Sequence, residues 1–157
     1  RLQVIDGGPK WPRVDIDYAH TPDAIEKALA ALRPQCRGEL ICIVGCGGDR
    51  DRGKRAQMGR AAAKGSDRVW FTSDNPRSED PERILADMAH GLELPNSQRV
   101  RSEVNRAEAI AAALQSADPD DILLIAGKGH EQTQEINGEF IPFSDFTVVH
   151  DIQSENN

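Results

Sequence analysis

Two short, uninterrupted apolar runs, at residues 40–44 and 122–126, constrain the fold more than any other feature of the sequence. A run of this kind is typical of a strand that is covered on both faces, as in a parallel sheet. Elsewhere the apolar residues recur at the three- and four-residue spacing of an amphipathic helix. The repeated switch between these patterns predicts a three-layer, Rossmann-like α/β domain, in which helices cover both faces of a mostly parallel central sheet.

Local patterns predict the remaining elements. Strands are expected at residues 1–6, 13–17, 69–72 and around Val100. Helices are expected after the caps Thr21 and Asp80, each followed by proline, and at about residues 54–64 and 107–114. Asn137-Gly138 predicts a type I′ hairpin between residues 134–136 and 140–141, so that the sheet ends with an antiparallel edge pair. The polar residues 154–157 are expected to fray.

Composition excludes several classes of protein. The 157 residues suit one domain, and 38% hydrophobic with 29% charged residues is not the composition of a disordered chain. No apolar run approaches the roughly 18 residues of a membrane-spanning helix. The formal net charge of −7 argues against a general nucleic-acid binder, which needs a basic face. The first residues contain no signal-peptide core and begin abruptly, as if cut from a longer chain.

The three cysteines, Cys36, Cys42 and Cys46, are spaced C-x5-C-x3-C. This spacing matches neither a paired disulfide framework nor the half-sites of structural zinc. It favours buried thiols in a reducing compartment.

Glycine and charge gather in three segments that each follow a predicted central strand: residues 45–55 (GCGGDRDRGKR), 73–77 (SDNPR) and 127–131 (GKGHE). Ligands of open α/β sheets bind beyond the carboxyl ends of the strands, so the three segments are expected to line one pocket. The guanidinium groups of Arg50 and Arg77 suit bidentate capture of carboxylate or phosphate, and Glu131 suits an ammonium group. A pocket with both signs indicates a zwitterionic ligand such as an amino acid.

The first segment also resembles a phosphate-binding loop. Gly48-x4-Gly53-Lys54-Arg55 nearly satisfies the pattern G-x-x-x-x-G-K-[ST]. Arg55 stands where the pattern needs a hydroxyl for Mg²⁺, and Asp49 and Asp51 would place negative charge in a phosphate nest. A nucleoside-triphosphate loop is therefore rejected. The dinucleotide pattern fails as well, because Arg50 stands where it needs glycine.

The histidines indicate no nucleophilic catalysis. His20 and His130 lie in the motif segments, but neither has a hydroxyl or thiol nucleophile at a recognisable spacing. A structural hydrogen-bonding role is favoured for both. His90 and His150 show no distinctive context.

Four motifs in register resemble the C-terminal domain of the Mur ligases: residues 17–23 (DYAHTPD), 45–55, 74–77 (DNPR) and 127–131. The similarity runs from Arg1 to about Val149 and is strongest to members that add meso-diaminopimelate. Two departures lie near the end, where Phe143-Ser144-Asp145-Phe146 replaces Tyr-Ser-Asp-Arg and a polar tail replaces the family's closing helix.

The resemblance implies a role for each matched position. The Asp-Asn-Pro-Arg tetrapeptide recognises diaminopimelate in the family, with the arginine on the distal carboxylate, and members that add lysine lack that arginine. The positions matched to the amino acid are Arg50, Asp74, Asn75, Pro76, Arg77, Gly127 and Glu131. The positions matched to ATP are Arg1, at the junction with the preceding domain, Asp17 and His20.

The resemblance also implies an activity. It is the ATP-dependent addition of meso-diaminopimelate to UDP-MurNAc-L-Ala-D-Glu in peptidoglycan synthesis, in the cytoplasm, with no nucleic-acid or membrane partner. ATP and Mg²⁺ would be bound mainly by the family's central domain, and the UDP-sugar by its N-terminal domain, both outside residues 1–157. These residues would then hold no catalytic group and be inactive alone. The alternatives are a free-standing amino-acid-binding or docking module without catalysis, and lysine-adding specificity, which Arg77 disfavours.

Overall fold

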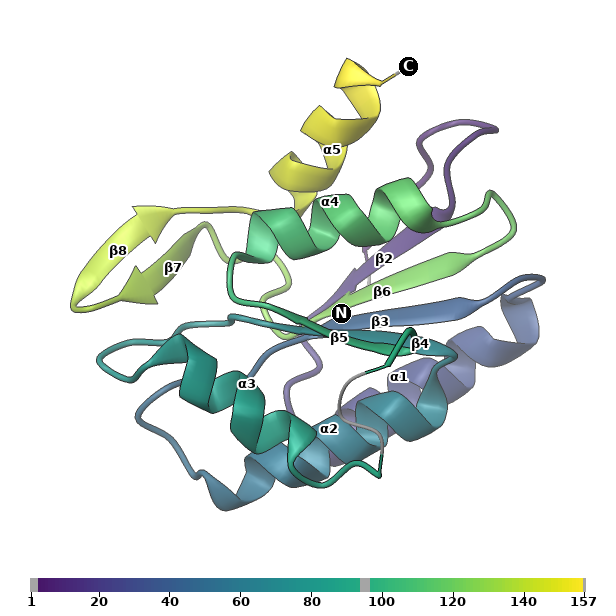
Figure 1. The fold of residues 1–157 in the computed structure, drawn as a ribbon. Helices are drawn as coiled ribbons and strands as arrows, with labels where there is room; N and C mark the ends of the chain where they lie inside the picture. Colours follow the sequence, from purple (N-terminus) through teal and green to yellow (C-terminus); the bar gives the residue numbers. More distant parts are fainter. Residues whose placement is uncertain (1–2, 94–96, 157) are drawn as a thin grey trace.

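The computed structural model describes residues 3–93 and 97–156 (Figure 1). Its elements, in chain order, are β1 (Gln3–Ile5), β2 (Arg13–Asp17), α1 (Pro22–Leu32), a 3₁₀ turn (Arg33–Gln35), β3 (Leu40–Val44), α2 (Gly53–Gly65), β4 (Arg68–Thr72), α3 (Pro81–Ala89), β5 (Val100–Glu103), α4 (Arg106–Ser116), β6 (Ile122–Ala126), β7 (Thr133–Ile136), β8 (Glu139–Pro142) and α5 (Asp145–Glu155). Within the described ranges, no helix has both the length and the apolar character needed to cross a bilayer.

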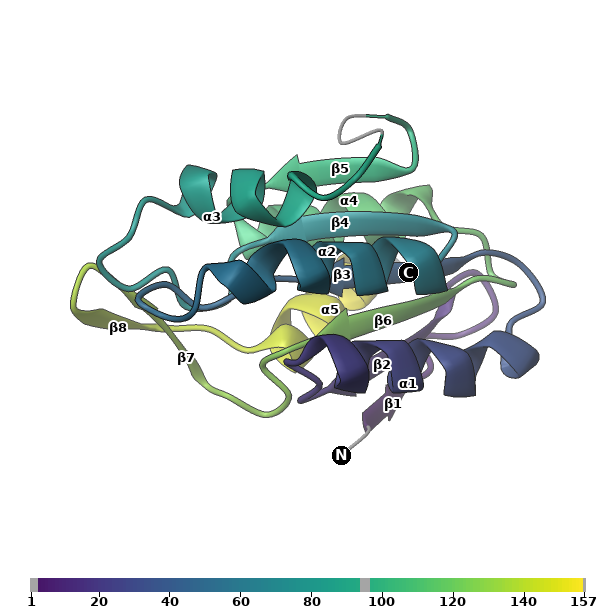
Figure 2. The same ribbon diagram turned by 90° about the horizontal axis from the view of Figure 1, so that it is seen from below.

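A six-stranded sheet in the order β1-β2-β6-β3-β4-β5 forms the middle layer. All neighbouring strands are parallel except β1, which pairs antiparallel with β2. Helices α1, α2 and α3 cover one face, and α4 and α5 cover the other (Figures 1 and 2). The central strands β3 and β6 therefore face apolar side chains on both sides, which explains their uninterrupted apolar runs. The predicted three-layer architecture is confirmed.

Helix caps define where several helices begin. The Thr21 hydroxyl accepts a hydrogen bond from Ala24 N at 3.1 Å, and the Asp80 carboxylate accepts one from Glu82 N at 3.0 Å. In both cases proline occupies the first helical position, where its missing N–H has no cost. Both predicted starts are confirmed.

The predicted hairpin is present, but β7 and β8 form a sheet of their own. Asn137 and Gly138 both have positive φ, 51° and 78°, as a type I′ turn requires. The hairpin cannot pair with β6, the strand before it, because β6 already has β2 and β3 on its two sides. The antiparallel edge is formed by β1 instead.

Helix α5 corrects the expectation of a polar tail in place of a closing helix. The Ser144 hydroxyl caps it by accepting from Thr147 N at 3.2 Å, and Ser154 and Glu155 belong to its last turn. Val149 is fully buried in the cluster beneath α4, and Val148 and Ile152 pack against that cluster. Polar residues between these apolar ones, together with weak helix formers, concealed the stripe in the sequence.

The three cysteines are free thiols. Cys42 is fully buried, whereas Cys36 and Cys46 are half-buried. Burial raises the pKa of the Cys42 and Cys46 thiols to about 12, which makes both poor nucleophiles at neutral pH.

Candidate functional site

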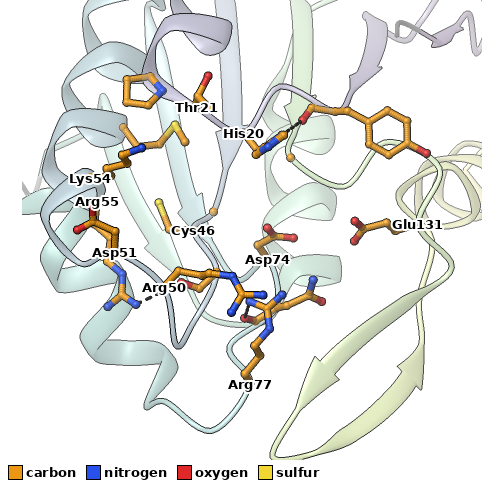
Figure 3. Close-up of a pocket in the computed structure, with 17 residues that line it drawn as sticks. His20, Thr21, Cys46, Arg50, Asp51, Lys54, Arg55, Asp74, Arg77 and Glu131 are labelled. Atoms are coloured by element: carbon orange, nitrogen blue, oxygen red, sulfur yellow. Dashed lines mark hydrogen bonds between the residues drawn. The ribbon is translucent and has the colours of Figure 1, made fainter.

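A cavity of about 520 Å³ lies beyond the carboxyl ends of the central strands (Figure 3). Its wall is formed by residues 18–22, by the three glycine-rich segments and by the start of α2. The parallel arrangement brings these segments together, as the sequence predicts. The predicted site residues in the wall are His20, Arg50, Asp74, Asn75, Arg77, Gly127 and Glu131.

Three other predicted site residues are not in that wall. Asp17 lies next to it: its carboxylate accepts a hydrogen bond from Ala19 N at 2.9 Å, and its backbone carbonyl accepts one from Gly127 N at 3.0 Å. Pro76 belongs to the second segment but is buried and does not line the cavity. Arg1 lies outside the described residues.

The first two segments are joined by hydrogen bonds at Gly48. Its N–H donates to the Asn75 carbonyl at 2.8 Å, and its carbonyl accepts from Arg77 Nη1 at 3.0 Å. Asp49 contributes as well, because its carboxylate accepts from the Ser78 hydroxyl. Asp49 and Arg77 have φ angles of 57° and 55°, a region that non-glycine residues rarely adopt. The hydrogen bonds between the segments hold these backbones in place.

Arg50 and Arg77 lie close together on the cationic side of the cavity, and Lys54 and Arg55 also line its wall (Figure 3). Both approach Gly47, where a Cβ would lie 2.7 Å from Arg77 Nη1 and 3.5 Å from Arg50 Cγ. Arg77 Nε pairs with Glu135 at 3.2 Å, and among the described residues Nη2 has no hydrogen-bond partner. Because Nη1 already donates to the Gly48 carbonyl, the guanidinium N–H groups of Arg77 that are open to a ligand are those on Nη2.

The anionic side consists of Asp74 and Glu131, with a lysine behind them. Lys128 is fully buried and donates to Glu131 Oε1 at 3.0 Å and to Asn75 Oδ1 at 3.1 Å; its Nζ lies 3.6 Å from Asp74 Oδ1. Asp74 Oδ1 is itself buried and has no hydrogen-bond partner among the described residues. Sequence reasoning missed Lys128, because a lysine in a loop is usually solvated.

His20 lies in the cavity wall on the side away from Arg50 and Arg77 (Figure 3). Its Nδ1 lies 2.8 Å from the Tyr18 carbonyl oxygen. A carbonyl can only accept, so Nδ1 donates, and Nε2 is the acceptor of the neutral ring. His130 instead makes an edge contact with the Tyr18 ring, at a centroid distance of 5.8 Å.

The start of α2 does not form a nucleotide phosphate loop. Arg55, at the position where such a loop has a hydroxyl, is buried and donates to Glu79 at 2.6 Å and to Asp87 at 3.0 Å. The Asp51 carboxylate accepts from Gly53 N at 2.9 Å, so an anion of the chain itself already occupies this position. The geometry agrees with the rejection made from the sequence.

The Arg55–Glu79 pair predicts a pH-dependent stability. The hydrogen bond from Arg55, and then the one from Asp49 N, lower the pKa of the Glu79 carboxyl from 4.5 to about 2. A lowered pKa in the folded chain stabilises it above about pH 4.5, and this contribution is lost as the pH falls to about 2. The variant Glu79→Gln should therefore be less stable than the unmodified chain at pH 7, and the difference should shrink toward pH 2.

Urea unfolding across this pH range measures the effect. The control is Glu26→Gln, on the exposed side of α1, for which the difference should stay small throughout. A Glu79→Gln difference that does not change with pH would contradict the assignment of the effect to this pair.

Comparisons with known proteins by sequence and by structure all point to one family. A family model described as Mur ligase, glutamate ligase domain, matches residues 1–129. The protein named UDP-N-acetylmuramoyl-L-alanyl-D-glutamate--2,6-diaminopimelate ligase in Pseudomonas putida is 53% identical over 147 residues, which are 94% of this chain and 29% of that protein. The protein of the same name in Coxiella burnetii is 52% identical over 145 residues, with 92% and 29% covered.

A solved structure of an enzyme of the same name superposes with a TM-score of 0.93 at 44% identity, covering 99% of this chain and 31% of that one. The chain thus spans less than a third of the length of these three relatives.

Proposed function

The chain belongs to the Mur ligase family, and from this membership we propose that it binds the amino-acid substrate of an ATP-dependent ligase. The ligase adds meso-diaminopimelate to UDP-MurNAc-L-Ala-D-Glu in the cytoplasm, as part of cell-wall synthesis. Residues 1–157 are its C-terminal domain. The domains that hold ATP and the UDP-sugar lie in other parts of the enzyme.

The observation that carries this proposal is that positively and negatively charged side chains line the same cavity. Arg50 and Arg77 offer cationic groups, and Asp74 and Glu131 offer carboxylates, around one space of about 520 Å³. Meso-diaminopimelate carries an ammonium and a carboxylate at each end, whereas lysine carries only an ammonium at its distal end. Arg77 therefore has a partner on the distal end of diaminopimelate and none on that of lysine.

The chain contributes positioning to the reaction. In the first step the terminal phosphoryl group of ATP is transferred to the γ-carboxylate of the D-glutamyl residue, which gives an acyl phosphate and releases ADP. The diaminopimelate amine then attacks that acyl phosphate, forming the amide bond and releasing phosphate and a proton. A cavity that grips the distal end leaves the other amine free to reach the acyl phosphate. Holding the two reactants together in this way lowers the entropic part of the barrier.

Nucleotide and metal would be held mainly by other domains. Membership in the family assigns Mg²⁺ mainly to the central domain. Among residues 3–93 and 97–156, no group of three or more histidine, cysteine or acidic side chains could hold a metal ion. His20 offers ATP one ring nitrogen at the cavity wall, and Asp17 supports the turn that carries His20. ATP supplies the phosphoryl group when it is bound.

Titration of the chain with meso-diaminopimelate and with L-lysine, followed by NMR, tests the proposal. We expect weak binding of meso-diaminopimelate, because domains of such enzymes close on substrate, with shifts centred on residues 74–77 and 127–131. Lysine should produce smaller shifts at the same concentrations. An equal response to both amino acids, or shifts remote from these segments, would refute the proposal.

The variant Arg77→Lys should bind meso-diaminopimelate more weakly by about 1–3 kcal/mol, which is roughly 5- to 150-fold. The substitution keeps the charge but removes the planar guanidinium group, in which Glu135 and the Gly48 carbonyl hold Nε and Nη1 while Nη2 stays open to a carboxylate. Calorimetric titration measures the change. Arg37→Lys, an exposed arginine before β3, is the matched control and should bind like the unmodified chain. Unchanged affinity in Arg77→Lys would exclude the carboxylate contact.

A further inference from the structure

We propose that Lys128 is a positioning residue that sets the charge of the cavity and thereby its selectivity for a ligand end bearing both an ammonium and a carboxylate. The inference rests on the proposed function, because it concerns how the same cavity separates meso-diaminopimelate from lysine. Lys128 is not part of the cavity wall, so it acts through the residues that are.

Lys128 links the two segments that carry the anionic side of the cavity. From the segment after β6, its ammonium donates to Glu131, and it reaches across to Asn75 in the segment after β4. Asp74 Oδ1 is 3.6 Å from the same nitrogen. The side chain is fully buried, so these acceptors replace its water. Burial of an ammonium group is unfavourable unless such partners surround it.

The backbone turns Lys128 inward. The flanking glycines, Gly127 and Gly129, have φ angles of 109° and 54°, which residues with a side chain rarely adopt. At Gly129 a Cβ would also overlap the Tyr18 ring. Glycine on both sides therefore allows the chain to reverse direction around the lysine. The result is a cation placed beneath the cavity instead of in solvent.

Lys128 balances the charge of the anionic side. With Asp74 and Glu131 it forms a group with one net negative charge, which would become two negative charges without the lysine. On the cationic side, Arg77 is already paired with Glu135. A more negative cavity would still attract an ammonium group but would repel a carboxylate. Loss of Lys128 should therefore favour the lysine side chain over the distal end of diaminopimelate.

Lys128 also orients Asn75. The Asn75 Oδ1 accepts from Lys128 Nζ at 3.1 Å and from Glu135 N at 2.9 Å. With the amide oxygen engaged twice, the amide nitrogen of this wall residue is left as a donor for a ligand. A donor at this place suits a carboxylate. The positive charge of Lys128 and the orientation that it gives the Asn75 amide thus both favour a ligand that carries a carboxylate.

The test compares dissociation constants for meso-diaminopimelate and L-lysine, measured by NMR titration of the unmodified chain and of Lys128→Met. We expect the constant for meso-diaminopimelate to rise about tenfold or more, the scale of one lost charge-assisted interaction, while that for lysine stays equal or falls. Lys64→Met, about 15 Å along α2 from Lys54 in the wall, is the control for total charge and should change neither constant.

A second variant, Lys128→Gln, keeps hydrogen-bond donors and removes the charge, and should show the same loss of selectivity if methionine unfolds the chain. Heteronuclear spectra establish that each variant is folded. Unchanged selectivity in a folded variant would overturn the inference. Unfolding of both variants would also overturn it, because Lys128 would then be required for the fold.

The outcomes separate this inference from the proposed function. If the unmodified chain does not prefer meso-diaminopimelate over lysine, the proposed function fails, whatever the variants do. If the unmodified chain prefers meso-diaminopimelate and a folded Lys128 variant keeps the same ratio of constants, only the role of Lys128 fails.

Discussion

The variant Asp145→Asn is expected to lower the free energy of unfolding by about 3–5 kcal/mol, the range for breaking a buried ion pair by removing one partner. Asp145 and Arg106 are fully buried, and two hydrogen bonds of 2.8 Å join their side chains. Asparagine keeps the shape of the side chain but leaves the guanidinium charge without its counter-ion in the interior. Urea unfolding at pH 7 measures the loss.

The double variant Arg106→Met with Asp145→Asn should recover part of that loss, because the buried charge is then removed as well. The control is Asp23→Asn, which breaks the exposed pair between Asp23 and Lys27 and should cost about 0–1 kcal/mol. A loss below about 1 kcal/mol for Asp145→Asn would show that the pair does not hold the fold together.

This pair also supports the candidate site. Arg106 donates to the backbone carbonyls of Ser73 and Ala126, both at 3.1 Å. Ser73 is the first residue of the segment 73–77, and Ala126 immediately precedes the segment 127–131. Helices α4 and α5 are therefore tied to the ends of β4 and β6 through one guanidinium group.

The variant Gly48→Ala should destabilise the chain by about 3 kcal/mol or more and abolish detectable binding of meso-diaminopimelate. A Cβ at Gly48 would overlap the carbonyl oxygen of Pro76 and lie 2.6 Å from its carbonyl carbon. Backbone atoms cannot move aside like a flexible side chain, so the second segment must shift. The hydrogen bonds that join Gly48 to Asn75 and Arg77 would then be lost.

Thermal unfolding and calorimetric titration of Gly48→Ala measure the two effects. Gly53→Ala is the matched control: the same chemical change at the start of α2, where the nearest atom to the new Cβ is the flexible Asp51 carboxylate at 3.2 Å. That variant should stay folded and keep its affinity. Retained binding in Gly48→Ala would show that the second segment does not need its present position.

Most of the fold could be predicted because its signals are local. Several signals depend only on residues that are close together in the sequence. They are the apolar runs of β3 and β6, the caps Thr21 and Asp80 and the turn Asn137-Gly138. The gathering of the three segments also followed, because parallel strands present their carboxyl ends at one edge. Helix α5 was missed because its apolar stripe is narrow and its residues form helices weakly.

Other features depend on contacts between distant residues. That β7 and β8 form a separate sheet follows from the central place of β6 in the strand order, which no single segment encodes. The buried positions of Lys128 and Arg106 were equally hidden, because each has a partner far away in the chain: Asn75, 53 residues from Lys128, and Asp145, 39 residues from Arg106. In the sequence both residues look like ordinary solvated charges.

A crystal structure of the chain with meso-diaminopimelate would show whether this cavity recognises an amino acid with a zwitterionic distal end. The expected binding mode places the distal carboxylate within hydrogen-bond distance of Arg77 and the distal ammonium between Asp74 and Glu131. Diaminopimelate bound elsewhere, or in the cavity with its distal carboxylate away from Arg77, would contradict it.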